Sequence, residues 1–223
     1  PFLWIILLAL GGRFALLTLS DLLNLQHLRP APPDGLADIY DPDRYRRSQQ
    51  YLRDNTRYDL VVRAFDLAVV LAMIFAGGFN AIDGIARAAG FGPIGTGLVF
   101  GGLLLAGSKL LHLPFSLYHT FALEERYDFN RTTTRTFAAD WIKELLLTAA
   151  IGGILFAVVL ALFRNAGEWA WVIAWAAVSL LQFLLIYLAP IVILPLFNKF
   201  TPLEEGELRD RLTDYAERQQ FRL

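Results

Sequence analysis

The sequence lacks cysteine altogether and contains only three histidines. The absence of cysteine excludes disulfide scaffolds, thiolate zinc sites and cysteine nucleophiles. An excess of either charge is also missing, since 20 basic and 21 acidic residues leave a net charge of −1. No overall basic field is available to hold a nucleic acid, so we expect no nucleic-acid partner.

Charged residues are scarce as well, at 18% of the chain against about 25% in an ordinary globular domain. The charges are also segregated, because residues 145–163 and 169–197 contain no Asp, Glu, Lys or Arg. A membrane-spanning helix needs about 20 mostly apolar residues, and both runs meet or approach that length. The sequence therefore predicts an integral membrane protein, with the lipid bilayer as its first partner.

Five apolar segments can be marked along the chain: roughly 1–25, 64–82, 92–113, 145–163 and 169–197. Each has to be helical, because an open strand would leave backbone groups unsatisfied in lipid. We therefore predict an all-α fold, a polytopic membrane helical bundle of about five transmembrane helices with cytoplasmic helical connections. In the first connection, Asp41-Pro42 is typical of an N-cap followed by proline at the first helical position.

The distribution of Lys and Arg predicts the orientation. The four connections contain seven, one, five and one of these residues, and the tail contains five. By the positive-inside rule, the first and third connections and the tail are cytoplasmic, and the N-terminus lies outside. These counts fit a bacterial inner membrane and an endoplasmic reticulum equally well.

The third apolar segment is rich in glycine and includes the pair Gly97-x-x-x-Gly101. Small residues let helix backbones approach closely in lipid, so we expect tight packing here, with a gate or hinge as the alternative. The last segment contains Pro190 and Pro195, which predict a kink near its cytoplasmic end.

The third connection is the densest candidate site. Glu124 and Glu125 are adjacent, so on a helix they point about 100° apart and cannot form one carboxylate pair. We expect ion pairs with Arg126, Arg131 or Arg135, and the alternative is a contact with substrate.

The histidines give little support for a metal site within these residues. His112 and His119 are seven positions apart, whereas a zinc site usually has His-x-x-x-His spacing. Asp66 and Lys109 lie near the cytoplasmic ends of their segments, where both can reach water. Arg13 lies deeper and is a functional candidate with an unknown partner. The sequence contains no His-Glu-x-x-His, Gly-x-Ser-x-Gly or dinucleotide-binding motif.

Two blocks of residues resemble the membrane domain of the type I CAAX prenyl proteases, which are membrane-embedded zinc metalloproteases. One runs from Leu113-Pro114-Phe115 through Glu124-Glu125-Arg126-Tyr127-Asp128-Phe129-Asn130 to Phe137, Asp140 and Lys143. The other is Leu194-Pro195-Leu196-Phe197-Asn198-Lys199-Phe200-Thr201-Pro202-Leu203, and weaker matches lie at Ser48–Tyr51 and Thr56–Tyr58. The motif residues whose role is unassigned are Glu124, Glu125, Asn130, Asp140, Lys143, Pro195 and Asn198.

The resemblance implies a multi-helix membrane chamber, a cytoplasm-facing zinc site and cleavage near the C-terminus of prenylated proteins. In the family, the two histidines and glutamate that hold zinc lie downstream of a segment like 201–222. None of those positions exists in this sequence, so it assigns no catalytic and no metal-binding residue. Zinc is expected to be bound by the missing downstream domain, and this chain alone is expected to be inactive.

We therefore predict a membrane domain over residues 1–200 and the truncated start of a cytoplasmic helical or protease domain over 201–223. A capping box at Thr201-Pro202-Leu203-Glu204 predicts that a helix begins there. The expected partners are the chain's own downstream protease domain, contacted by the loop from Glu124 to Asn130, and a prenylated or membrane-delivered peptide substrate. Two alternatives stay open: a transporter or channel module, suggested by the glycine-rich and proline-broken segments, and a non-catalytic membrane scaffold.

Overall fold

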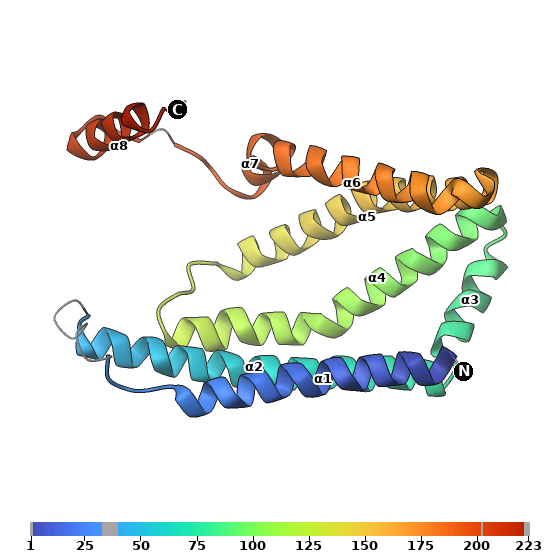
Figure 1. Ribbon diagram of the computed structural model, residues 1–223, viewed down its shortest axis with the longest axis horizontal. Helices are drawn as coiled ribbons and strands as arrows, with labels where there is room; N and C mark the ends of the chain where they lie inside the picture. The colour runs from blue at the N-terminus through green and yellow to red at the C-terminus, as the bar shows by residue number, and fades with distance from the viewer. Residues whose placement is uncertain (1, 33–39, 202, 221–223) are drawn as a thin grey trace. The chain divides into compact units, whose positions relative to one another are not determined.

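The computed structural model describes residues 2–32, 40–201 and 203–220, and every regular element in these ranges is a helix (Figure 1). This confirms the predicted all-α fold. The elements are α1 (Phe2–His27), α2 (Pro42–Phe75), α3 (Gly78–Ala88), α4 (Gly92–Tyr118), a π-helical turn (His119–Glu124), α5 (Thr134–Asn165), a 3-10 turn (Gly167–Trp169), α6 (Ala170–Leu188), a second π-helical turn (Ala189–Ile193), α7 (Leu194–Phe197) and α8 (Glu207–Arg218).

The chain divides into two compact units, residues 1–161 and 162–223. The first unit contains α1 to α4 and most of α5, and the second contains α6 to α8. The predicted domain boundary at residue 200 lies inside the second unit and stays a prediction.

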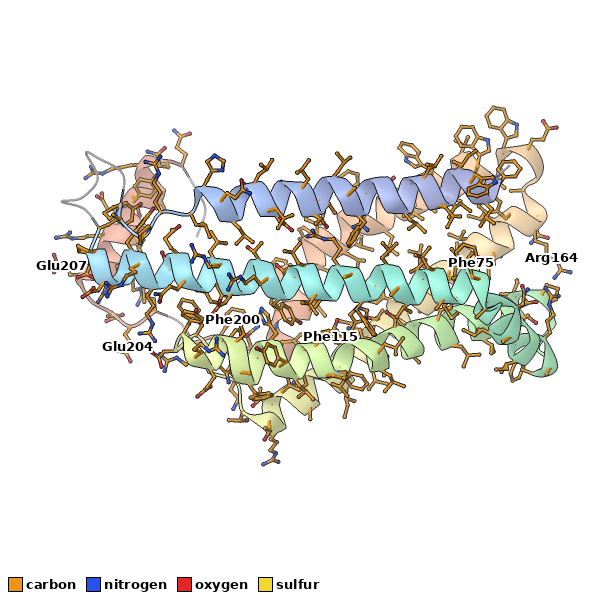
Figure 2. All side chains as sticks on the ribbon, turned by 90° about the horizontal axis from the view of Figure 1, so that it is seen from below. Phe75, Phe115, Arg164, Phe200, Glu204 and Glu207 are labelled. Carbon is orange, nitrogen blue, oxygen red and sulfur yellow. The ribbon has the colours of Figure 1, made fainter. Side chains whose placement is uncertain are left out.

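Four helical stretches are long and apolar enough to cross a membrane, and α2 with α3 forms a fifth candidate that is bent by 67°. This confirms the prediction of about five spans. The bend was not predicted, because residues 64–82 are marked in the sequence as one apolar segment. It falls at Gly77, whose positive φ of 72° is readily adopted by glycine. The apolar side chains along these helices are mostly exposed, as expected of surfaces that face lipid (Figure 2).

Helix α2 joins a polar half to an apolar half without interruption. It begins as predicted, with Asp41 as N-cap and Pro42 at the first position, and the backbone N–H of Arg44 donates to Asp41 Oδ1 over 2.8 Å. The helix has 34 residues and therefore extends about 51 Å at about 1.5 Å per residue. A hydrocarbon core is about 30 Å thick, so a large part of α2 continues beyond it.

Side chains of α5 reach the glycine pair of α4. A methyl group added at Gly97 would lie 2.6 Å from Leu160 Cδ1, and one added at Gly101 would lie 3.0 Å from Phe156 Cε1. Both distances are shorter than a normal carbon–carbon contact of about 3.5–4.0 Å, so the absence of a side chain is what permits this approach. Side chains of α5 therefore occupy the space over both glycines, and the choice between tight backbone packing and a gate or hinge stays a prediction.

Two further expectations concern the second unit. Near Pro190 and Pro195 the regular α-helix changes, because α6 passes into the π-helical turn and then into α7, but residues 167–197 remain one helical stretch and the predicted kink stays a prediction. The helix expected from the capping box at 201–204 is wrong for the described residues, since α8 begins only at Glu207. Gly206 precedes it with extended backbone, so the chain reaches the helical conformation later than the capping pattern indicates. Pro202 of that pattern lies outside the described residues.

Candidate functional site

The loop of residues 124–130, here the Glu124–Asn130 loop, packs on the first half of α2 within the first unit (Figure 1). Tyr127 is buried at 8% exposure, and its hydroxyl donates to Asp54 Oδ2 over 2.7 Å. The ring of Tyr51 meets the rings of Tyr127 and Phe129 edge-on, at centroid distances of 5.2 and 4.8 Å. Three aromatic rings and one directed hydrogen bond therefore fix the loop against α2.

Asp54 is the shared acceptor of this contact. Burial raises the pKa of Tyr127 and the hydrogen bond to Asp54 raises it further, so the phenol stays protonated and remains a donor at neutral pH. Arg126 Nη1 also lies 3.3 Å from Asp54 Oδ2, and Arg47 pairs with Asp128. Asp128 has a φ of 61°, in the left-handed region that Asp tolerates better than most residues. One carboxylate of α2 and one of the loop thus join the two segments.

The predicted site residues Glu124, Glu125 and Asn130 form the internal structure of the loop. Asn130 Nδ2 donates to Glu125 Oε2 over 2.9 Å, and Asn130 Oδ1 accepts the backbone N–H of Thr132 over 2.7 Å. Glu124 Oε1 lies 3.6 Å from His119 Nδ1. These partners differ from the arginines that the sequence suggested, because Arg126 is turned toward Asp54 on α2.

The two histidines of this region contact different acceptors on α2. His119 Nε2 lies 2.9 Å from Asn55 Oδ1, and His112 Nε2 lies 2.6 Å from Asp66 Oδ1. Helix α4 runs through Pro114 as far as Tyr118, and His119 then begins the π-helical turn. In the part of the chain that the structure describes, no group of three or more His, Asp or Glu side chains is arranged to hold a metal ion.

Three polar links connect four helices in sequence order, and we call this set the polar ladder. They are Asp21–Arg63 between α1 and α2, Asp66–His112 between α2 and α4, and Lys109–Glu144 between α4 and α5. The spacing explains the order, because α2 and α4 each contribute two residues three positions apart. Asp66 and Lys109, which were expected to reach water near the boundary, each have a partner on a neighbouring helix.

Arg13, the deeper charge of α1, lines a cavity of about 330 Å³ between α1 and α2. Asp59, Arg63 and Asp66 line the same cavity. The cavity therefore adjoins the polar ladder, and two carboxylates of α2 face the same space as Arg13.

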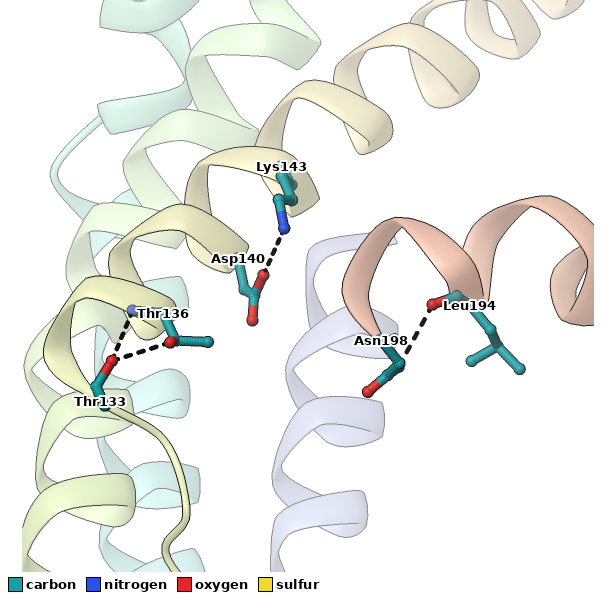
Figure 3. Close-up of polar contacts among 6 residues, drawn as sticks. All are labelled: Thr133, Thr136, Asp140, Lys143, Leu194 and Asn198. Carbon is teal, nitrogen blue, oxygen red and sulfur yellow. Dashed lines mark hydrogen bonds and ion pairs between the residues drawn. The ribbon is translucent and has the colours of Figure 1, made fainter. Parts of the chain in front are cut away.

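The remaining motif residues lie in the first three turns of α5 and around α7. Lys143 Nζ donates to Asp140 Oδ1 over 3.0 Å near the start of α5, where Thr133 Oγ1 accepts the backbone N–H of Thr136 over 3.2 Å (Figure 3). In the second unit, Pro195 lies in α7, and the backbone N–H of Asn198 donates to the carbonyl of Leu194 over 2.9 Å. The side-chain amide of Asn198 donates to the same carbonyl over 3.4 Å. Asp140 and Asn198 thus have partners within their own helical segments.

Comparison with known proteins decides the family. The family described as "CAAX prenyl protease N-terminal, five membrane helices" matches residues 21–199. The chain belongs to this family. It is thus the membrane portion of a CAAX prenyl protease family protein and a multi-pass integral membrane protein.

Individual relatives agree with the family match. "Probable CAAX prenyl protease 1" of Schizosaccharomyces pombe is 34% identical over 206 residues, which cover 85% of this chain and 43% of the relative. "CAAX prenyl protease 1" of Saccharomyces cerevisiae is 33% identical over 202 residues, covering 86% of this chain and 44% of the relative. The crystal structure of S. mikatae Ste24p superimposes with a TM-score of 0.90 at 31% identity and covers 100% of this chain and 53% of that chain. The chain spans less than half the length of these curated relatives.

The sequence did not single out the α2 residues that contact the loop and His119, namely Arg47 and Asp54 for the loop and Asn55 for His119. They lie between or beside the two weak family matches at Ser48–Tyr51 and Thr56–Tyr58. Counting along the helix, positions 47, 51, 54, 55 and 58 fall on one face, because their spacing is three or four residues. That pattern of polar and aromatic residues on one helical face was the feature of the sequence that could have indicated this contact surface.

Proposed function

We propose that this chain is the membrane part of a zinc metalloendopeptidase that cleaves prenylated or otherwise membrane-delivered polypeptides, and that it forms the wall of an intramembrane chamber. The observation that carries the proposal is the superposition of the whole chain on Ste24p at a TM-score of 0.90. The family match over residues 21–199 supports it independently. Four to five candidate spans supply the helices that such a wall requires.

The zinc of this enzyme is held by residues outside the chain. His112 and His119 face Asp66 and Asn55 on α2, and the described residues offer no set of three ligands around one point. These contacts do not fit a catalytic zinc site among the described residues. The 223-residue chain by itself has no peptidase activity under this proposal.

The Glu124–Asn130 loop receives the downstream protease domain. Tyr127 is buried against Asp54, whereas Phe129 contacts Tyr51 with its ring edge-on and still remains 56% exposed. Glu125 and Asn130 hold the loop in one conformation through a 2.9 Å hydrogen bond. A preformed loop with an exposed aromatic ring is suited to docking a second domain, because little ordering is required on contact.

The loop and the tail face the cytoplasm, and the N-terminus lies outside. Support comes from the two cation-rich connections: Arg47 of the first contacts Asp128 of the third, so both occupy one end of the first unit. The membrane domain ends near residue 200, and residues 201–223 begin the cytoplasmic protease domain.

The test compares the protein at its natural length with the 223-residue chain, both in vesicles, using a farnesylated peptide that ends in a CAAX sequence. We expect cleavage by the natural-length protein, loss of cleavage with a zinc chelator and recovery when zinc is returned. We expect no cleavage by the 223-residue chain. Zinc-loaded natural-length protein that does not cleave the peptide would contradict the proposal, and solute flux without cleavage would favour the transporter alternative.

A further inference from the structure

A cavity of about 530 Å³ lies between α2 and the end of α4, within the first unit. Val61 of α2 and Phe115 of α4 give it an apolar part, and Figure 2 shows Phe115 on α4 where it runs beside α2. Asp54, Arg57, Tyr58, Tyr118 and Arg126 give it a polar part. The cavity therefore combines an apolar wall with two guanidinium groups, two phenols and the carboxylate of Asp54.

The negative charges around this cavity are already engaged. Every Asp and Glu between residues 41 and 131 has a hydrogen-bond or ion-pair partner: Asp41, Asp43, Asp54, Asp59, Asp66, Asp83, Glu124, Glu125 and Asp128. Arg126 shares Asp54 with Tyr127. Arg57 is not the partner of any carboxylate in the described ranges. The lining therefore holds two guanidinium groups against the one carboxylate of Asp54, which pairs with Arg126, and the charge of Arg57 is left without a carboxylate partner among the described residues.

The position of the cavity along the helices indicates the class of ligand. Residues 57–61 directly precede the apolar segment 64–82, and residues 114–118 directly follow the apolar segment 92–113. The cavity therefore lies where two spans meet the headgroup region, the zone in which tyrosine is enriched. Basic pockets between membrane helices at this zone are suited to anionic headgroups.

We propose that this cavity binds an anionic phospholipid, with its phosphate between Arg57 and Arg126 and one acyl chain along Val61 and Phe115. The guanidinium groups offer paired N–H donors that match phosphate oxygens. The tyrosine hydroxyls line the same polar part and can donate to the headgroup. This site does not depend on the proposed peptidase activity, although it shares Arg126 with the loop proposed to receive the downstream domain.

The experiment measures lipid binding by native mass spectrometry of the natural-length protein in detergent. The probes are dioleoylphosphatidylglycerol and dioleoylphosphatidylcholine, which share their acyl chains and differ in headgroup charge. We expect tighter binding of the anionic lipid, and we expect Arg57→Gln to weaken that binding about fivefold. The matched control is Arg53→Gln, one turn earlier on the same helix and outside the cavity lining, which should leave binding unchanged.

A second variant separates cavity occupancy from surface charge. Val61→Trp fills the apolar part without altering any charge, and it should reduce binding of the anionic lipid as strongly as Arg57→Gln. Inorganic phosphate at millimolar concentration should not displace the lipid, because it cannot use the apolar wall. Equal affinity for the two lipids, equal losses in Arg53→Gln and Arg57→Gln, full binding in Val61→Trp, or displacement by phosphate would each overturn the proposal.

Discussion

Two contacts of the first unit hold neighbouring segments together in opposite ways. The Glu124–Asn130 loop is attached to α2 by directed polar bonds, centred on Asp54. Helix α5 is attached to α4 by the absence of side chains at Gly97 and Gly101. The first contact depends on which polar groups are present. The second depends on how much space the side chains leave between the two helices.

The difference follows from the solvent available to each contact. Between apolar helices in lipid, burial of apolar surface gives little net gain, so close van der Waals approach decides the packing. At the end of the bundle, water competes for every polar group, and only bonds that are partly buried, such as that of Tyr127, contribute much. The polar ladder combines features of both contacts, because its links are polar, like those of the loop, but they join helices, like the contact at the glycines.

The largest effect is expected where the ladder is broken on one side. Arg63 and Asp21 pair over 2.7 Å with side-chain exposures of 25% and 23%. Arg63→Met leaves Asp21 partly buried without its cation, which should cost about 3 kcal/mol of stability. The measurement is the thermal unfolding midpoint of the detergent-solubilised natural-length protein.

The companion variant for this link is the double change Arg63→Met with Asp21→Asn. It removes both charges, so it should recover most of the stability lost by Arg63→Met alone. If the double variant is as unstable as the single one, the pair acts only through packing and the ladder does not resemble the polar contact of the loop.

An intermediate effect is expected at the close helix contact. Gly97→Leu inserts a side chain where Leu160 Cδ1 would lie only 2.6 Å from the first added carbon, and such overpacking costs about 2 kcal/mol. Thermal unfolding measures the loss, and cross-linking between cysteines introduced on α4 and α5 reports their separation. Gly102→Leu is the control, since nothing lies within 4 Å of a methyl group at that position. Similar losses in both variants would show that helix composition, and not spacing, governs this contact.

The smallest effect is expected at the loop. Tyr127→Phe keeps the ring and deletes the hydroxyl that donates to Asp54, which should cost about 1 kcal/mol of local stability. Hydrogen exchange of the backbone amides of residues 124–130 should rise about fivefold, while exchange in α4 stays constant. Tyr118→Phe serves as control, because that side chain is 53% exposed. Unchanged exchange in Tyr127→Phe would assign the attachment of the loop to its aromatic rings alone.

The membrane fold could be predicted because lipid leaves few choices. Runs such as 169–197 contain no charged residue, and only helices satisfy their backbone in hydrocarbon. The length of α2 could not be predicted in the same way. Its charged first half is typical of a connection in hydropathy, and nothing in that half shows that the helix continues unbroken from Pro42 to Phe75.

Only the loop residues of the candidate site were predicted from the sequence, and their partners on α2 were not. Glu124, Glu125 and Asn130 stand out as a motif, and the structure brings them together with α2. Their partners could not be inferred, because Tyr127 and Asp54 are 73 positions apart and a single sequence does not specify which distant residues meet. The polar ladder was hidden for the same reason, since Asp66 and Lys109 each resemble an ordinary boundary charge until their neighbours are placed.

The continuity of α2 has a mechanical consequence. A stiff rod about 51 Å long that pivots by about 10° in the bilayer moves its far end by about 9 Å. The Glu124–Asn130 loop is bound at Asp54, 21 residues and about 32 Å from Phe75, so the same pivot would move the loop by about 5 Å. A change in the angle of the span would therefore reach the loop as a displacement at the membrane surface.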